Sequence, residues 1–176
     1  MENSSIETLC PLCRKENIVI EAYVGLKPYW HCHECRIIFL SPEHRLDSNA
    51  ERARYLEHEN NSSDPRYRKF LSRLARHLTP HLSTGAHGLD YGAGPGPTLS
   101  LMLEEQGFSM SIYDPFFAPD TSALEDTYDF ITCTETVEHF FNPACEFRRL
   151  NSMLKPGGWL GIMTEMVMPE QKFKDW

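Results

Sequence analysis

The pattern of apolar and polar positions predicts alternating helices and strands over the second half of the chain. Asp64-Pro65 offers an N-cap and a first-turn proline, and apolar residues then recur at helical spacing as far as Leu78, before Pro80 ends the helix. From residue 86 onward, short strand-like runs alternate with helical segments. Such alternation predicts an α/β architecture, with a parallel sheet covered on both faces.

The expected elements of this region follow one another at short intervals. Strands are predicted at 87–90, 108–113, 122–124, 128–133 and 159–163, and helices at 97–106 and from 142 to the turn that begins at Pro156. The third strand has the weakest pattern. The sheet is therefore expected to contain about five strands.

The first part of the chain lacks this alternation. Strand-like runs occur at 18–20 and 37–39, and a polar, charged stretch with helical character around 50–57 follows. The predicted division is a small N-terminal unit at 1–45, a connector at 46–63 and a sheet domain at 64–176.

Four cysteines in the N-terminal unit have the spacing of metal ligands. They form two Cys-x-x-Cys pairs that are separated by 18 residues: Cys10, Cys13, Cys32 and Cys35. Two such turns can converge on one tetrahedral ion, and a segment of about thirty residues buries too little apolar surface to fold without one. We therefore predict a zinc ribbon. His31 and His33 flank Cys32, but they are expected at the surface because four thiolates complete the ligand shell.

Composition and charge narrow the location and the partners. Hydrophobic residues make up 41% of the chain and charged residues 24%, as in ordinary folded proteins. We expect a cytoplasmic protein without a membrane partner, because neither a signal-peptide pattern nor an apolar run of about 18 residues is present. In that compartment paired cysteines are metal ligands more often than disulfides. The net charge of −8 opposes non-specific binding to nucleic acid but leaves a nucleic-acid substrate open.

A glycine-rich loop follows the first predicted strand of the sheet domain. It reads Tyr91-Gly92-Ala93-Gly94-Pro95-Gly96, so that bare backbone can approach a ligand at the carboxyl end of the sheet. Asp90 precedes the loop, and Asp114 ends the next strand. The carboxylate of Asp114 only accepts hydrogen bonds, which suits two vicinal hydroxyl groups. Dinucleotide-binding loops normally read Gly-x-Gly-x-x-Gly, and the compressed Gly-x-Gly-x-Gly spacing disfavours that alternative.

These motifs resemble those of class I S-adenosylmethionine-dependent methyltransferases. The resemblance covers roughly residues 64–168 and includes the turn 154–160, while the ribbon and the sequence His58-Glu59-Asn60-Asn61 look like one group of small bacterial members. It implies a Rossmann-like sheet and a cofactor site in which Asp90 engages the amino group and Asp114 the ribose hydroxyls. The implied cofactor-binding residues are Asp90, Tyr91, Gly92, Gly94, Gly96, Asp114, Pro115, Thr134 and Glu135.

His139 is the candidate catalytic residue. An unperturbed imidazole titrates near neutrality, so His139 could act as general base for a hydroxyl acceptor, or it could simply be a helix-start histidine bonded to backbone. If its segment is helical, Glu135, Glu138 and His139 share one face. They then resemble the Glu-x-x-Glu-His metal site of small-RNA 2′-hydroxyl methyltransferases. The later histidine ligand of those enzymes has no counterpart after His139.

The resemblance also bears on completeness and activity. Family members have seven strands and continue past the fifth with a helix and a hairpin, so we expect this chain, which stops at Trp176, to be an incomplete domain. The predicted function is methyl transfer from S-adenosylmethionine to an unidentified acceptor, a small molecule by preference. A module that binds a cofactor or a protein without turnover is the alternative. The oligomeric state stays open.

Overall fold

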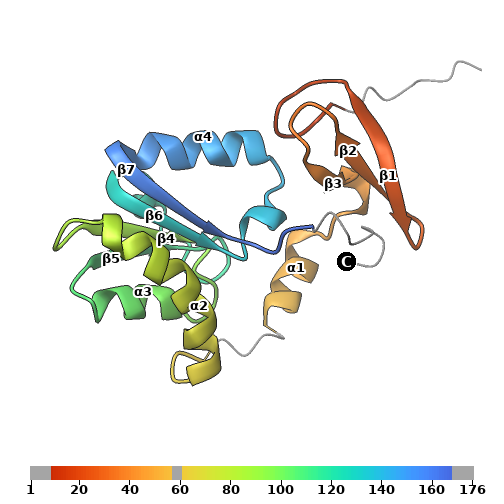
Figure 1. Ribbon diagram of the computed structural model, residues 1–176. Helices are drawn as coiled ribbons and strands as arrows, with labels where there is room; N and C mark the ends of the chain where they lie inside the picture. The colour runs from red at the N-terminus through yellow and green to blue at the C-terminus, as the bar shows by residue number, and fades with distance from the viewer. Residues whose placement is uncertain (1–8, 57–60, 168–176) are drawn as a thin grey trace, which may run out of the picture. The chain divides into compact units, whose positions relative to one another are not determined.

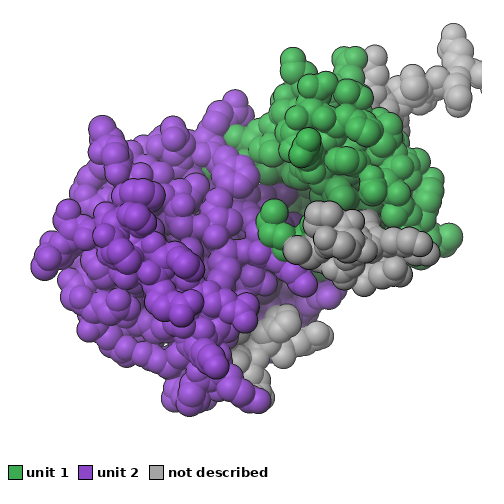
Figure 2. Space-filling view, viewed as in Figure 1, with its two compact units in different colours: residues 1–46, 141–146, 166–176 green, residues 47–140, 147–165 purple. Residues whose placement is uncertain are grey.

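The computed structural model describes residues 9–56 and 61–167. The described residues form two compact units, one containing 9–46, 141–146 and 166–167, the other containing the rest (Figure 2). Each unit has a sheet of its own. His58, Glu59 and Asn60 of the motif noted above lie outside the described residues.

The first unit is built on a small antiparallel sheet. Its strands β1 (Ile18–Val24), β2 (Lys27–Cys32) and β3 (Ile38–Leu40) follow the order β1-β2-β3, and the short 3-10 helix η1 (Pro42–His44) comes next. Among its described residues, the buried hydrophobic side chains are Cys10, Cys32 and Phe39. This small set is not a conventional apolar core.

The second unit contains a parallel sheet of four strands in the order β5-β4-β6-β7, which confirms the predicted α/β, Rossmann-like class. Its elements in chain order are α1 (Ser48–Tyr55), α2 (Pro65–Leu78), η2 (Thr79–His81), β4 (His87–Tyr91), α3 (Thr98–Glu104), β5 (Ser109–Tyr113), η3 (Thr121–Leu124), β6 (Tyr128–Thr134), η4 (Val137–His139), α4 (Pro143–Met153) and β7 (Leu154–Met163). Helix α4 begins within the first unit, at residues 143–146. Within the described ranges, no helix is long and apolar enough to cross a membrane.

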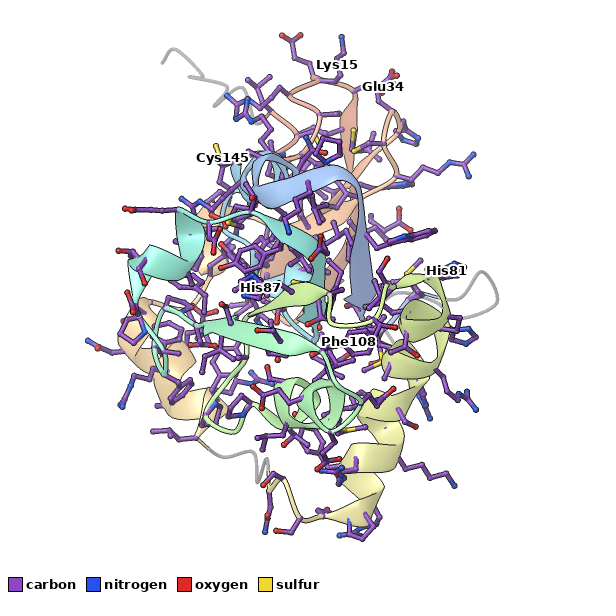
Figure 3. All side chains as sticks on the ribbon, turned by 90° about the vertical axis from the view of Figure 1, so that its left-hand side faces the viewer. Lys15, Glu34, His81, His87, Phe108 and Cys145 are labelled. Carbon is purple, nitrogen blue, oxygen red and sulfur yellow. The ribbon has the colours of Figure 1, made fainter. Side chains whose placement is uncertain are left out.

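Helices cover both faces of this sheet (Figure 1). One face packs against the apolar stripes of α2 and α3, in a cluster that includes Leu74, Leu103 and Phe130. Phe108 meets Phe130 edge-on at 5.7 Å in the same layer (Figure 3). The other face packs against α4 through residues such as Leu150. Chain order reverses direction between β4 and β6, which is where Rossmann-like sheets bind their ligands.

The prediction of a strand at 122–124 was wrong, and the described sheet has four strands rather than five. Residues 121–124 form the 3-10 helix η3 because the Asp120 side chain accepts a hydrogen bond from the Ser122 N–H, which stabilises a turn. The last strand also begins earlier than predicted, since Leu154 already pairs with Tyr128 ahead of an irregularity in the register.

Candidate functional site

The four predicted metal ligands come together in the first unit. The Sγ atoms of Cys10, Cys13, Cys32 and Cys35 all lie within 4.8 Å of one another, and the Cys10–Cys35 and Cys13–Cys32 pairs are 3.5 Å apart. Sulfurs around a tetrahedral zinc with Zn–S bonds of about 2.3 Å are separated by about 3.8 Å. The donor set therefore fits such an ion. No other group of three or more potential ligands is assembled by the described residues.

Two similar turns present these sulfurs. In the first turn, the N–H of Arg14 donates to the Cys10 carbonyl, and in the second the N–H of Arg36 donates to the Cys32 carbonyl. Both arginines adopt the left-handed conformation, with φ of 62° and 63°. Lys15 and Glu34 mark the two turns in Figure 3.

The surroundings of Cys32 favour its ionised form. Burial opposes ionisation, but the backbone N–H groups of Cys35 and Glu34, together with hydrogen bonds from the Cys13 and Cys10 side chains, lower the pKa of Cys32 to about 7. His31 turns instead to Glu21, with its Nδ1 3.1 Å from a carboxylate oxygen. The cluster thus consists of thiols alone.

The glycine loop lies at the carboxyl edge of the parallel sheet, as predicted. Gly92 and Gly94 have φ of 82° and 65°, and the Gly92 N–H donates to the carbonyl of Tyr113 at the end of β5. Thr136 covers the loop from the side of β6, and a Cβ on Gly92 would lie 2.3 Å from its Cγ2 atom. A side chain at position 92 would therefore disrupt the loop.

Asp114 links the glycine loop to the turn that follows β5. One carboxylate oxygen accepts from the Gly94 N–H at 2.9 Å, and the other accepts from the N–H groups of Phe116 and Phe117. These bonds use three of the four lone-pair sites of a carboxylate, leaving one for a ligand hydroxyl. The structure thus brings Asp114, which the sequence placed at the end of a strand, against the glycine loop, and its contact with ribose stays a prediction.

Asp90 points into the protein interior. The residue is only 2% exposed, and its side chain accepts hydrogen bonds from Thr132 Oγ1 at 2.8 Å and Ser100 Oγ at 3.1 Å. Burial raises the pKa of Asp90 to about 6, although the two hydroxyl groups act against this rise. Sequence reasoning missed Ser100 and Thr132. Each is a polar residue within a largely apolar element, Ser100 in a helix and Thr132 in a strand, and this pattern could have pointed to them. The role of Asp90 toward a cofactor stays a prediction.

The remaining predicted cofactor residues surround the loop. Tyr91 is buried and packs on Tyr113, with ring centroids 5.3 Å apart, while Gly96 bonds through its carbonyl to the N–H of Thr98. Pro115 is exposed in the turn after Asp114. Their ligand contacts also stay predictions.

The end of β6 holds an unusual conformation. Thr134 ends the strand half-buried, and Glu135 follows with φ of 50°, held by a hydrogen bond from its N–H to the Met163 carbonyl. Burial, together with the carboxylates of Glu138 and Glu165, raises the pKa of Glu135. Strained backbone of this kind is typical of functional sites.

His139 lies in η4, and the shared helical face considered for Glu135, Glu138 and His139 does not form. The backbone of Glu135 is in the left-handed conformation, and residues 137–139 form only one 3-10 turn. The spacing of an α-helix therefore does not apply to these three side chains. The imidazole is 45% exposed, and its Nδ1 lies 3.9 Å from Oε1 of Glu51 on α1. Sequence reasoning missed Glu51 because it assigned α1 to a connector.

A parallel sheet with a glycine loop clamped at its carboxyl edge defines this unit as a Rossmann-like cofactor domain. A family model described as a methyltransferase domain matches residues 51–176. The chain therefore belongs to this methyltransferase family, which confirms the resemblance noted in the sequence. Membership implies the use of S-adenosylmethionine.

Similar curated proteins share part of this region. The chain is 34% identical to the ubiquinone biosynthesis O-methyltransferase of Aeromonas salmonicida over 82 residues, which are 46% of this chain and 34% of the relative. It is also 34% identical to the protein of that name from Paraburkholderia xenovorans over 85 residues, 47% of this chain and 36% of the relative. The chain thus spans about a third of the length of these relatives.

Proposed function

We propose that this protein is an S-adenosylmethionine-dependent methyltransferase that transfers a methyl group to a hydroxyl of a small molecule. The observation that carries the proposal is the Asp114 carboxylate, which accepts from Gly94 and so holds an acidic strand end against the glycine loop. That arrangement lies inside the segment matched by the methyltransferase family. The relatives are named O-methyltransferases, which supports oxygen as the acceptor atom.

The residues at the carboxyl edge have distinct roles in this proposal. Gly92, Gly94 and Gly96 offer bare backbone to the methionine part of the cofactor, and Asp114 accepts from a ribose hydroxyl. When bound, S-adenosylmethionine supplies an already activated methyl group. The protein must then align the acceptor and exclude water from the site.

The cysteine cluster is proposed to hold a structural zinc ion. Four clustered thiols suit zinc, and the small set of buried side chains in the first unit gives the metal a folding role. The cytoplasmic location expected from the sequence is part of this proposal, because thiols such as the four of this cluster persist in a reducing compartment.

Calorimetry of cofactor binding tests the proposed site. We expect Asp114→Ala to weaken binding of S-adenosylhomocysteine by about 1.5–3 kcal/mol, the value of a lost hydrogen bond to a charged group. Asp126→Ala removes an exposed carboxylate of the same unit and should leave the affinity unchanged. Equal affinity for the Asp114 variant, or preferential binding of a nicotinamide dinucleotide, would contradict the assignment.

Transfer itself is tested with a labelled methyl donor and a panel of hydroxyl-bearing small molecules. Incorporation of label into the methoxy group of one acceptor is the expected result. Tight cofactor binding without any transfer would favour a binding module that does not turn over.

A further inference from the structure

Helix α1 contacts the strand-end turns of the second unit. The Tyr55 ring lies 5.3 Å from the His139 ring and 6.2 Å from the Phe116 ring, and the Arg52 guanidinium lies 5.7 Å over the ring of Phe117. The helix start is fixed because the Asp47 side chain accepts from two backbone N–H groups of the first turn. These contacts place the polar residues of α1 beside the turns that follow β5 and β6.

Glu51 and His139 form an asymmetric pair within these contacts. The Glu51 side chain is 15% exposed and the His139 side chain 45%, so the carboxylate lies behind a ring that solvent can reach. Oε1 of Glu51 faces Nδ1 of His139 at 3.9 Å. The other ring nitrogen, Nε2, makes no hydrogen bond with the part of the chain that the structure describes.

Other charged groups face the same place. Burial raises the pKa of Tyr55, and the carboxylates of Glu51, Glu138 and Asp114 raise it further, so its hydroxyl stays protonated. Burial also raises the pKa of Glu51, while the charge of His139 lowers it and that of Asp114 raises it. Carboxylates from α1, η4 and the end of β5 therefore act on the same small group of side chains, beside the Arg52 guanidinium of α1.

Building on the proposed transfer to a hydroxyl, we infer that Glu51 is a positioning residue that holds His139 with Nδ1 protonated and Nε2 free to take a proton. The acceptor O–H bond breaks, and its proton passes to Nε2. The electron pair left on oxygen forms the bond to the methyl carbon, while the carbon–sulfur pair returns to the donor sulfur. Glu51 then stabilises the imidazolium, as a carboxylate does in a catalytic triad.

The tautomer of His139 tests this role without any cofactor. In ¹⁵N NMR spectra of the whole chain, with His139→Gln used for assignment, we expect the Nδ1–H form to predominate in the neutral ring. Glu51→Ala should reduce that form at least two-fold. Glu138→Gln, which removes a charge from η4 itself, should leave the tautomer unchanged. An unchanged tautomer in Glu51→Ala, or an equal change in Glu138→Gln, would overturn the inference.

Kinetics provide a second measurement that a purely structural role would not affect. Glu51→Gln keeps the shape of the side chain, and we expect its kcat to fall about 10-fold or more, with the acidic limb of the pH–rate profile displaced. Its affinity for S-adenosylhomocysteine should stay within two-fold of the parent. A parent-like kcat and pH profile would overturn the role of Glu51. A parent protein that binds no cofactor would instead refute the proposed function, so the two failures are distinguishable.

Discussion

The two units are stabilised by different means. The second unit has apolar clusters on both faces of its sheet, built by α2, α3 and α4. In the first unit, two of the three buried hydrophobic residues among those described, Cys10 and Cys32, belong to the sulfur cluster. With zinc bound as proposed, coordination supplies the first unit with free energy that burial in so short a segment cannot provide.

Removal of one cysteine gives the largest expected effect on this comparison. Cys32→Ser should abolish tight zinc binding. The apparent binding free energy of a structural zinc ion is about 10–16 kcal/mol, and the variant should lose a large part of it. We expect limited proteolysis to cut within residues 9–46, while the thermal transition of the second unit stays in place. Zinc analysis and mass spectrometry of the fragments measure both effects.

Cys145→Ser is the matched control, because Cys145 is exposed and lies outside the sulfur cluster (Figure 3). It should keep about one zinc per molecule. If Cys32→Ser lost its metal and still protected residues 9–46 from protease, the ribbon would not depend on zinc and the comparison would fail.

Truncation of a core side chain should instead destabilise the second unit and leave the zinc cluster unaffected. Leu103 is fully buried between α3 and the sheet, so Leu103→Ala should reduce the free energy of unfolding of the second unit by about 2–5 kcal/mol. The zinc content should not change. Leu101 on the same helix is 40% exposed, so Leu101→Ala should reduce the free energy of unfolding by less than about 1 kcal/mol. Chemical denaturation and metal analysis measure these two effects. Loss of zinc from the Leu103 variant would show that the units do not fold independently.

The difference between the units also explains what the sequence could predict. Cysteine spacing and buried strands such as β4 and β6 follow from short-range chemistry and periodicity, and both were predicted correctly. The strand predicted at 122–124 does not form, because a hydrogen bond to the Asp120 side chain sets the conformation of residues 121–124. The contact between Glu51 and His139 joins segments far apart in the chain, and no local pattern encodes it.

The two units also differ in their buried polar groups, because among the described residues only the second unit encloses carboxyl groups such as that of Asp90. The folded-state pKa of Asp90 is raised from 3.8 to about 6, mainly by burial, so the folded state retains a proton that the unfolded state has lost between these values. Stability therefore falls as the pH rises through this window. The expected loss is about 3 kcal/mol, and it is complete above about pH 6.

In Asp90→Asn the free energy of unfolding should not fall in this way as the pH rises, since an amide does not ionise. The difference in unfolding free energy between the parent and this variant should therefore shift by about 2.4 kcal/mol in favour of the variant from pH 4 to pH 7. The pKa of exposed Asp120 is lowered by the Ser122 N–H, so Asp120→Asn should show a trend of opposite sign. A difference independent of pH for Asp90→Asn would contradict the burial argument. Urea denaturation at several pH values provides the measurement.

The smallest expected effect concerns backbone conformation, where the units again differ. The second unit places glycine at left-handed positions such as Gly92 and Gly94, whereas the first unit places Arg14 and Arg36 there. A non-glycine residue in this conformation costs about 1–2 kcal/mol, and part of the gain from glycine is lost to the greater entropy of the unfolded chain. Arg36→Gly should therefore stabilise the zinc-bound ribbon by about 0.5–1 kcal/mol.

That gain corresponds to a zinc affinity about two- to five-fold higher in competition with a chelator. Lys15→Gly is the control, because it removes one positive charge from the other cysteine turn at a position that is not left-handed. It should lower the affinity slightly, since glycine gains nothing there and still adds entropy to the unfolded chain. If both variants changed the affinity in the same direction, charge would control the ribbon. Opposite changes would establish that the arginine turns hold strain, which the binding of the metal overcomes.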